Sequence, residues 1–201
     1  MRRLTDDLSD DVKRRLPPGQ FVSKKWPVLH AGSVPACDEH SWTFSVDGLV
    51  DQPFTLSYAD FRQLPAATIT ADIHCVTRWS KLDMQWTGVP VRAVLDHAWP
   101  SHHAGFVVVH CEGSFTTNLP LEALYDDDVL LSWRADGQDL SPEHGWPLRL
   151  VIPKRYFWKS AKWVRRLEVV AADQPGFWER LGYHNDAFPW QEQRYQKARW
   201  W

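Results

Sequence analysis

Residues 72–80, with the sequence DIHCVTRWS, concentrate side chains that could do chemistry. They include the imidazole of His74, the thiol of Cys75, the guanidinium of Arg78 and the indole of Trp79. A cysteine thiolate can bind a soft metal centre, or attack a substrate when a histidine elsewhere in the chain acts as its base. The segment therefore predicts a reactive centre at Cys75, with both kinds of chemistry open.

Zinc binding is one alternative, because the dipeptide His-Cys occurs at residues 74–75 and again at residues 110–111. Neighbouring side chains on a strand point to opposite faces, so each extended dipeptide offers one ligand to a common centre. The sequence has neither CxxC nor HExxH spacing, which gives zinc little support. The third cysteine, Cys37, is interpreted as a small apolar side chain.

Residues 153–166, with the sequence PKRYFWKSAKWVRR, are strongly basic. Their cations are Lys154, Arg155, Lys159, Lys162, Arg165 and Arg166. Like charges at this density repel one another unless an anion or acidic neighbours offset them, so the segment predicts an anion-binding loop that includes the hydroxyl of Ser160. A solvated basic face stays open as an interpretation. So does stacking on single-stranded nucleic acid, because aromatic residues interleave the charges.

Composition limits the partners of the chain as a whole. With 201 residues and a net charge of -2, the chain has no global attraction to nucleic acid or to an anionic membrane surface. Three cysteines without paired spacing do not make a disulfide framework, which favours a reducing compartment. We find neither a secretory signal nor a spanning segment, so we expect a cytoplasmic protein.

The elements that position these residues are mostly strands. Period-two alternation and short apolar runs predict strands over residues 42–50, 68–75, 106–111, 129–133, 148–152 and 163–170. Helices are expected from the cap Ser57 to Pro65, and from Pro90 to Ala98. These patterns predict one α+β domain of mostly β mixed sheets with short helices over residues 17–201, preceded by a flexible arm at residues 1–16.

Three longer segments carry a family resemblance: residues 72–91, 144–170 and 176–185. Together they resemble the molybdopterin-dependent oxidoreductases of the sulfite oxidase family. The resemblance covers about residues 17–196. Within the family, the chain looks closest to small single-domain bacterial members related to the catalytic subunit of the periplasmic methionine sulfoxide reductase.

The resemblance implies a sulfite-oxidase-type molybdopterin-binding fold around one Mo-molybdopterin. By motif position, Cys75 would be the protein ligand to molybdenum. From their adjacency to Cys75, we expect Arg78 to orient a substrate oxygen, Trp79 to wall the pocket and His74 to adjust its hydrogen bonds. The residues that match the cofactor contacts of the family are His30, Cys111, His144, Arg149, Ser160, Ala161 and Lys162. His74 joins this predicted cofactor-binding set because it adjoins Cys75.

The same resemblance implies two-electron oxygen-atom transfer on a small S- or N-oxide. The chain lacks the dimerisation and haem domains of some relatives and shows chiefly Arg78 near Cys75, so sulfite is not the expected substrate. Electrons would pass to or from a separate electron-transfer protein, with no nucleic-acid partner. The alternative is a non-enzymatic module that binds an anion or single-stranded nucleic acid through residues 153–166.

Overall fold

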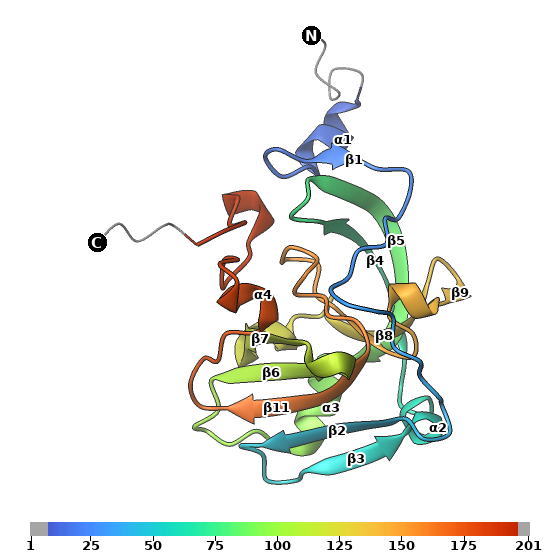
Figure 1. Cartoon of the computed structure of the whole chain (residues 1–201), viewed down its shortest axis with the longest axis vertical. Coiled ribbons are helices and arrows are strands. Elements are labelled where there is room, and N and C mark those ends of the chain that lie inside the picture. The colour runs from blue at the N-terminus through green and yellow to red at the C-terminus, as the bar shows by residue number, and fades with distance from the viewer. Residues whose placement is uncertain (1–7, 197–201) are drawn as a thin grey trace.

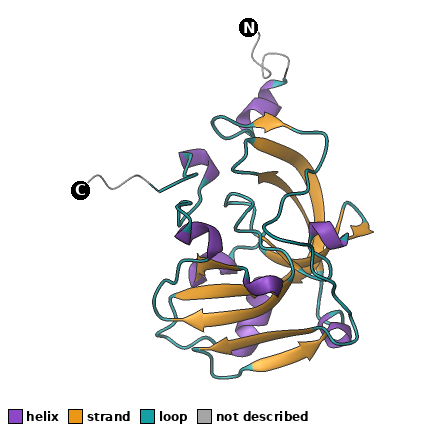
Figure 2. Ribbon diagram, viewed as in Figure 1, coloured by secondary structure: helices purple, strands orange, loops and turns teal. Residues whose placement is uncertain are grey.

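The computed structural model describes residues 8–196, in which two β-sheets and the loops between them make up most of the chain (Figures 1 and 2). The strands of the first sheet are β1 (Phe21–Val22), β4 (Ala67–His74), β5 (Trp79–Pro90), β8 (Leu130–Ala135), β9 (Gln138–Asp139) and β10 (Arg149–Val151). The strands of the second sheet are β2 (Thr43–Gly48), β3 (Phe54–Ser57), β6 (Phe106–Cys111), β7 (Thr116–Pro120) and β11 (Val164–Val170).

Short helices fill the edges and connections. The α-helices are α1 (Asp10–Arg14), α2 (Tyr58–Phe61), α3 (Val91–Ala98) and α4 (Phe177–Arg180). The 3-10 turns are η1 (Glu112–Ser114), η2 (Leu121–Tyr125), η3 (Pro142–His144) and η4 (Pro189–Gln191). Within the described part of the chain, none of these helices has the length and apolar character needed to cross a bilayer.

The long strand β5 organises the first sheet. It pairs antiparallel with β4 and β8 and parallel with the short β1. Strands β4 and β5 form a hairpin, and the turn between them holds residues 75–78. The chemically rich segment of the sequence therefore lies at the closed end of this hairpin.

Strand β11 is the centre of the second sheet, which runs in the order β3-β2-β11-β6-β7. It pairs parallel with β2 and antiparallel with β6. In β2 the buried side chains Phe44 and Val46 alternate with the more exposed Thr43, Ser45 and Asp47, as the sequence predicts. Helix α3 packs against this sheet through Val91, Val94, Leu95 and Ala98, which share one helical face.

The predicted α+β architecture is confirmed, with mixed sheets and few short helices. Ser57 caps α2 by accepting a hydrogen bond from the backbone N–H of Asp60. In the predicted arm, residues 10–14 form α1, and Arg15 donates to the Asp72 carboxylate at 2.8 Å. Residues 1–7 and 197–201 lie outside the described residues, and the limits of the arm and the domain stay predictions.

A fully buried ion pair attaches the C-terminal segment to the two sheets. Lys159 Nζ lies 2.7 Å from Glu179 Oε1 of α4, and neither side chain is exposed. The ammonium also donates to the backbone oxygen of Asn118 on β7 at 2.8 Å. The indole of Trp158 donates to the same Glu179 oxygen at 3.0 Å. Loop 153–163, β7 and α4 are thus held at one buried point.

Removing one member of this pair leaves the other charged and buried. We expect Glu179→Ala to lower the free energy of unfolding by about 3–5 kcal/mol in denaturant titrations. The control Asp47→Ala breaks the half-exposed pair with Arg166 and should cost about 0–1 kcal/mol. Equal losses in the two variants would show that the buried pair does not hold the C-terminal segment.

Candidate active site

A cavity of about 700 Å³ lies between the β4–β5 turn, loop 153–163 and the segment that contains α4. Its lining comes from six stretches of chain, at residues 26–35, 75–77, 112–115, 144–149, 157–163 and 177–183. This volume is in the range of cofactor and ligand sites. A side chain that binds or acts on a ligand in this cavity must be part of its lining.

Cys75 reaches the cavity from the β4–β5 turn. Its backbone N–H donates to the carbonyl of Trp79, and its carbonyl accepts from the N–H of Arg78, which closes the turn. The amide of Gln20 donates to the same carbonyl at 3.0 Å. The hydroxyl of Thr77, which also lines the cavity, donates to the Cys75 sulfur at 3.1 Å. The thiol is thus held in a fixed position.

Cys75 is buried, with 8% of its residue surface exposed, and the three cysteines are free. Burial raises its pKa, and the hydrogen bond from Thr77 opposes that rise. A thiol of this kind is a weak nucleophile at neutral pH unless a base or a metal takes its proton. Among residues 8–196, no three His, Cys, Asp or Glu side chains converge as a metal site, so the zinc alternative finds no ligand set there.

Arg149 is the most strongly buried cation of the cavity lining, with 1% of its surface exposed. Its guanidinium donates to the carbonyls of His144 at 2.8 Å and Ser160 at 2.9 Å, and its Nε is buried without a partner. Within residues 8–196 it forms no ion pair, and burial lowers its pKa to about 9. A buried, unneutralised cation is costly, which indicates an anionic ligand.

Lys162 and His144 extend this polar wall. Lys162 Nζ donates to the backbone oxygen of Glu143 at 2.6 Å. Burial, with a smaller contribution from the charge of Arg149, lowers the pKa of Lys162 to about 7. His144 stacks on Trp26 with ring centroids 3.8 Å apart, burial lowers its pKa, and its Nε2 atom is buried without a partner. This wall offers both charge and an unused hydrogen-bonding atom.

The other predicted residues that line the cavity are His30, Ser160 and Ala161. The Ser160 hydroxyl accepts a hydrogen bond from the Ile152 N–H at 3.0 Å, which fixes the loop. Residues 27–35, which include His30, have no regular secondary structure and form one wall of the cavity. The structure therefore brings Cys75 together with six of the eight residues predicted to bind the cofactor: His30, His144, Arg149, Ser160, Ala161 and Lys162.

His74 and Cys111 are buried but are not part of this lining. The Nδ1 atom of His74 is paired with the Ser80 hydroxyl at 2.8 Å, and burial lowers its pKa to about 4. His74 adjoins Cys75 on the chain, where alternation sends its side chain to the other face. Cys111 belongs to the hydrophobic core at the end of β6, where it pairs with Val164 of β11 and burial raises the pKa of its thiol. Their proposed cofactor roles stay predictions.

Arg78 and Trp79 also lie outside the set of lining residues. Arg78 has a positive φ of 80°, and its exposed side chain extends toward Gly19. Trp79 is buried and packs edge-on against Phe157, which itself lines the cavity. The structure does not bring Arg78 to the point where it would orient a substrate, so that role stays a prediction.

Most charges of the basic segment are used in the structure. Four cations pair with carboxylates: Lys154 with Asp126, Lys159 with Glu179, Arg165 with Glu112 and Arg166 with Asp47. Arg155 covers the ring of Phe188 at 3.5 Å. Lys162 is the cation of this segment that lines the cavity. The predicted anion site is therefore a pair, Lys162 and Arg149, rather than a cluster of six.

An aromatic part of the lining was not predicted from the sequence. It consists of Phe115, Trp158, Phe177, Trp178 and Tyr183. Three of these lie within residues 176–185, which carry part of the family resemblance but from which no site residue was predicted. The abundance of tryptophan, 13 in the chain, was the available signal, but composition does not say which indoles face a cavity.

A family model described as the oxidoreductase molybdopterin binding domain matches residues 31–178. The chain belongs to the molybdopterin-dependent oxidoreductases of the sulfite oxidase family. The matched residues include Cys75 and all the predicted cofactor-binding residues except His30. The protein is accordingly an enzyme of this family with a molybdopterin cofactor.

Relatives support this membership over different lengths. The chain is 46% identical over 186 residues to the uncharacterized oxidoreductase YuiH of Bacillus subtilis (strain 168), covering 92% of this chain and 94% of YuiH. It is 29% identical over 191 residues to the NADPH nitrate reductase of Beauveria bassiana, covering 81% of this chain and 21% of that protein. The second match therefore concerns a small part of a much longer enzyme.

A third relative is provisionally named a protein-methionine-sulfoxide reductase subunit, YedZ1, of Azospira oryzae (strain ATCC BAA-33 / DSM 13638 / PS). It is 26% identical over 147 residues, covering 73% of this chain and 56% of that protein. The crystal structure of the sulfane dehydrogenase SoxCD from Paracoccus pantotrophus superposes with a TM-score of 0.66 at 24% identity. That match covers 76% of this chain and 43% of the SoxCD chain, and it confirms the fold.

The cavity residues of this oxidoreductase fit molybdopterin. The cofactor needs a pocket for a phosphate, and Arg149 and Lys162 supply cations that have no carboxylate partner in the described chain. The free Nε atom of Arg149 and the free Nε2 atom of His144 can bond its polar groups. As a thiolate, Cys75 would be a soft ligand that suits the metal.

The low pKa of Lys162 makes anion binding depend on pH. Lys162 loses its charge as the pH rises through about 7, whereas sulfate keeps its charge. We expect sulfate to bind the cofactor-free protein more weakly above that pH, by up to about tenfold per pH unit in calorimetric titrations.

Between about pH 6 and about pH 8, below the pKa of about 9 of Arg149, the variant Lys162→Met should bind sulfate with little change in affinity. The control Lys154→Met removes an exposed cation that pairs with Asp126, and it should keep the dependence. A wild-type affinity that is the same at about pH 6 and about pH 8 would contradict the assignment of Lys162 as an anion-binding cation.

Proposed function

We propose that this oxidoreductase moves one oxygen atom to or from a small S- or N-oxide in a two-electron reaction, with the Cys75 thiolate as the protein ligand to molybdenum. One observation carries the proposal. The Cys75 thiol lines the same cavity as Arg149, a buried cation without a carboxylate partner in the described chain. A group able to bind a metal and a group able to bind an anion thus share one cavity.

Cys75 is suited to hold a metal because the surrounding hydrogen bonds fix it. The turn of residues 75–78 is closed by backbone bonds, and Gln20 and Thr77 add side-chain bonds to the Cys75 carbonyl and sulfur. Burial disfavours a free thiolate, whereas a bound metal ion would stabilise it. A single protein sulfur is sufficient because the dithiolene of the pterin supplies two more.

The bound molybdenum–pterin group supplies the two-electron oxygen-atom exchange. The protein binds and orients that group. Arg149 and Lys162 would neutralise its phosphate, and His144 would bond a polar atom through Nε2. Because Arg149 is held by two backbone carbonyls, its charge is in place before the cofactor binds, which lowers the reorganisation cost of binding.

Electron supply from a separate redox protein is part of this proposal. The relative YedZ1 is named a subunit, which supports a partner for this chain as well. The cytoplasmic location stays a prediction, and so does the substrate-orienting role of Arg78.

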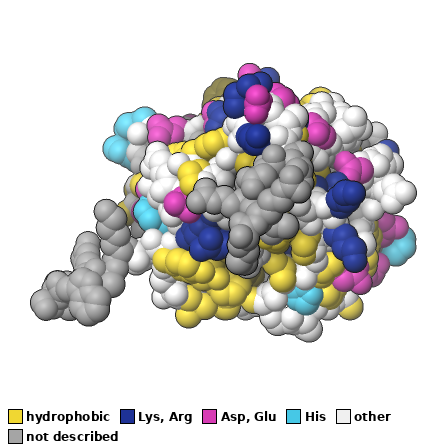
Figure 3. All heavy atoms as spheres, turned by 90° about the horizontal axis from the view of Figure 1, so that it is seen from above, with side chains coloured by type: hydrophobic (Ala, Val, Ile, Leu, Met, Phe, Trp, Pro, Cys, Tyr) yellow, Lys and Arg dark blue, Asp and Glu magenta, His cyan; other side chains and the backbone are white. Residues whose placement is uncertain are grey.

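The alternative of a nucleic-acid or anion-binding module has less support. Its cations at residues 153–166 are largely paired with carboxylates. On the face that Figure 3 shows, basic groups stand apart from one another among acidic groups and hydrophobic areas. Phosphate backbones are bound by continuous basic surfaces, so the distribution of charge favours the enzyme.

Metal content and turnover test the proposed function together. Protein purified from a host that makes molybdopterin should contain about one molybdenum atom per chain and turn over an S- or N-oxide with a redox dye. Cys75→Ala should abolish turnover. The control Cys37→Ala removes a free cysteine that does not line the cavity, and it should leave turnover unchanged.

Active protein without molybdenum would refute the proposed function. Full turnover by molybdenum-loaded Cys75→Ala would refute the role of Cys75 while leaving the family assignment intact. The substrate panel should include sulfite, methionine sulfoxide, other S- and N-oxides and nitrate, because this choice separates the chemistries open to the family.

A further inference from the structure

We propose that Arg194 is a positioning residue of the metal site. It holds the turn that carries Cys75, and through Thr77 it fixes the hydrogen bond to the Cys75 sulfur. This inference rests on the proposed function, in which Cys75 is the protein ligand to molybdenum. Arg194 lies beyond residues 31–178, to which the family model applies, so that match gives it no role.

Arg194 is a buried cation, with 7% of its surface exposed. Its Nη1 atom donates to the Val76 carbonyl at 2.6 Å, and its Nη2 atom donates to the Pro18 carbonyl at 3.1 Å. The guanidinium also covers the ring of Tyr156, 4.9 Å from the ring centroid. One cation thus contacts three other segments of the chain, and one of them is the turn of residues 75–78.

An ion pair does not account for the burial of Arg194. The Glu192 carboxylate lies 3.8 Å from the Arg194 Nε atom, and the Glu192 side chain is half exposed. The Nε atom itself is buried without a hydrogen-bond partner in the described part of the chain. A half-exposed pair at this distance contributes little, whereas a hydrogen bond from a charged donor is about twice as strong as a neutral one. The two carbonyls are therefore the main partners of the guanidinium.

The bond to Val76 leads to the Cys75 sulfur through one peptide unit. The Val76 carbonyl belongs to the peptide between Val76 and Thr77, which is planar and rigid. The hydroxyl of Thr77 donates to the Cys75 sulfur at 3.1 Å. Because the guanidinium fixes the orientation of this peptide, it also fixes the point from which the Thr77 side chain extends. Arg194 therefore positions the donor to the sulfur.

The bond to Pro18 supports the same turn from a second side. Pro18 lies two residues before Gln20, which is buried and donates through its side-chain amide to the Cys75 carbonyl at 3.0 Å. The chain then enters β1, which pairs with the start of β5, directly after the turn. Arg194 therefore holds the turn twice, directly at Val76 and indirectly through the segment that carries Gln20.

The backbone on either side of Arg194 is itself anchored. Its carbonyl accepts a hydrogen bond from the N–H of His184 at 3.2 Å. The side-chain amide of Gln196 donates to the Glu179 carbonyl at 3.1 Å. Because Glu179 belongs to the buried ion pair of α4, the place of Arg194 depends on the same anchor as the rest of the C-terminal segment.

The visible absorption of the molybdenum-loaded enzyme tests this role. The part of that absorption that Cys75→Ala removes is the charge transfer from the thiolate to molybdenum. A hydrogen bond to the sulfur weakens electron donation by the thiolate. Losing it should move this band to longer wavelength and make the molybdenum reduction potential more negative. We expect both shifts in Thr77→Val and in Arg194→Met, with turnover of a redox dye about tenfold lower.

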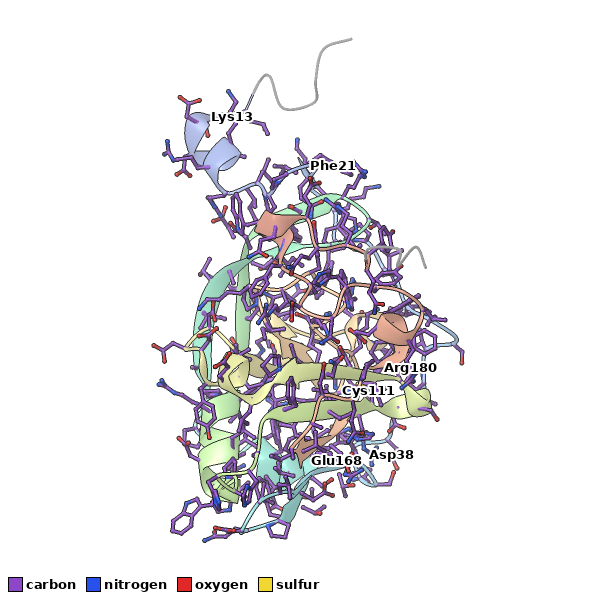
Figure 4. All side chains as sticks on the ribbon, turned by 90° about the vertical axis from the view of Figure 1, so that its left-hand side faces the viewer. Lys13, Phe21, Asp38, Cys111, Glu168 and Arg180 are labelled. Atoms are coloured by element: carbon purple, nitrogen blue, oxygen red, sulfur yellow. The ribbon has the colours of Figure 1, made fainter. Side chains whose placement is uncertain are left out.

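The double variant Thr77→Val/Arg194→Met separates positioning from a general structural effect. If Arg194 acts through the Thr77 hydroxyl, the double variant should shift no further than Arg194→Met alone. The control Arg180→Met removes an exposed guanidinium that also bonds a backbone carbonyl of the C-terminal segment, that of Pro175 at 2.9 Å. Figure 4 shows Arg180 well away from Phe21 of β1, which pairs beside the turn, so the control should keep the wild-type band and potential.

The outcomes distinguish the two proposals. A wild-type band and potential in molybdenum-loaded Arg194→Met would overturn the positioning role, and so would shifts that add in the double variant. Either result would leave Cys75 as the ligand. Visible absorption that Cys75→Ala leaves unchanged in molybdenum-loaded protein would instead overturn the proposed ligand itself.

A second substitution keeps the test decisive if Arg194→Met does not fold. Arg194→Lys retains the charge, but an ammonium lacks the fork of donors with which the guanidinium bonds two carbonyls. Smaller shifts in the same direction support the positioning role, and a wild-type band and potential in Arg194→Lys contradict it.

Discussion

The cavity of this enzyme depends on one buried ion pair, between Lys159 and Glu179. It joins loop 153–163, β7 and α4, and two of these three parts also carry residues of the lining. A buried pair of this kind contributes little net stability compared with apolar packing, but it is costly to break on one side. It therefore specifies where the C-terminal segment lies more than how stable the domain is.

The cations that stabilise the fold and the cations that line the cavity are mostly different residues. The cations that pair with carboxylates, such as Arg166 with Asp47, hold strands and loops together. Arg149 and Lys162 bond backbone carbonyls instead, which orients them without neutralising them. Backbone carbonyls can position a cation while leaving its net charge available, and this arrangement prepares an anion site in a chain whose net charge is -2.

The fold was predictable where the patterns are local. Period-two alternation predicted β2, and the spacing of Val91, Val94, Leu95 and Ala98 predicted α3. Strand alternation also predicted that His74 and Cys75 face apart. Pairing across the chain was not predictable in this way, because no local pattern shows that Arg165 meets Glu112 or that Lys159 meets Glu179.

The candidate site was predictable mainly through its family motifs. Those motifs led to Cys75, Arg149 and Lys162, which the structure brings to one cavity. The role inferred for Arg78 from its adjacency to Cys75 stays a prediction, because Arg78 does not line the cavity and its side chain lies close to Gly19. The sequence did not predict the aromatic part of the lining, because its residues come from three separated segments. Only the folded chain shows that their rings are in contact.

The wall formed by residues 27–35 differs from the rest of the cavity. The backbone of residues 24–37 makes no hydrogen bond to the other described backbone, and Val28 and Leu29 are 44% and 49% exposed. Displacing this stretch would break no sheet ladder, so its opening costs far less than unfolding the domain. A bulky prosthetic group could thus enter the cavity after the two sheets have folded. Folding of the domain and activation of the enzyme would then be two separate events.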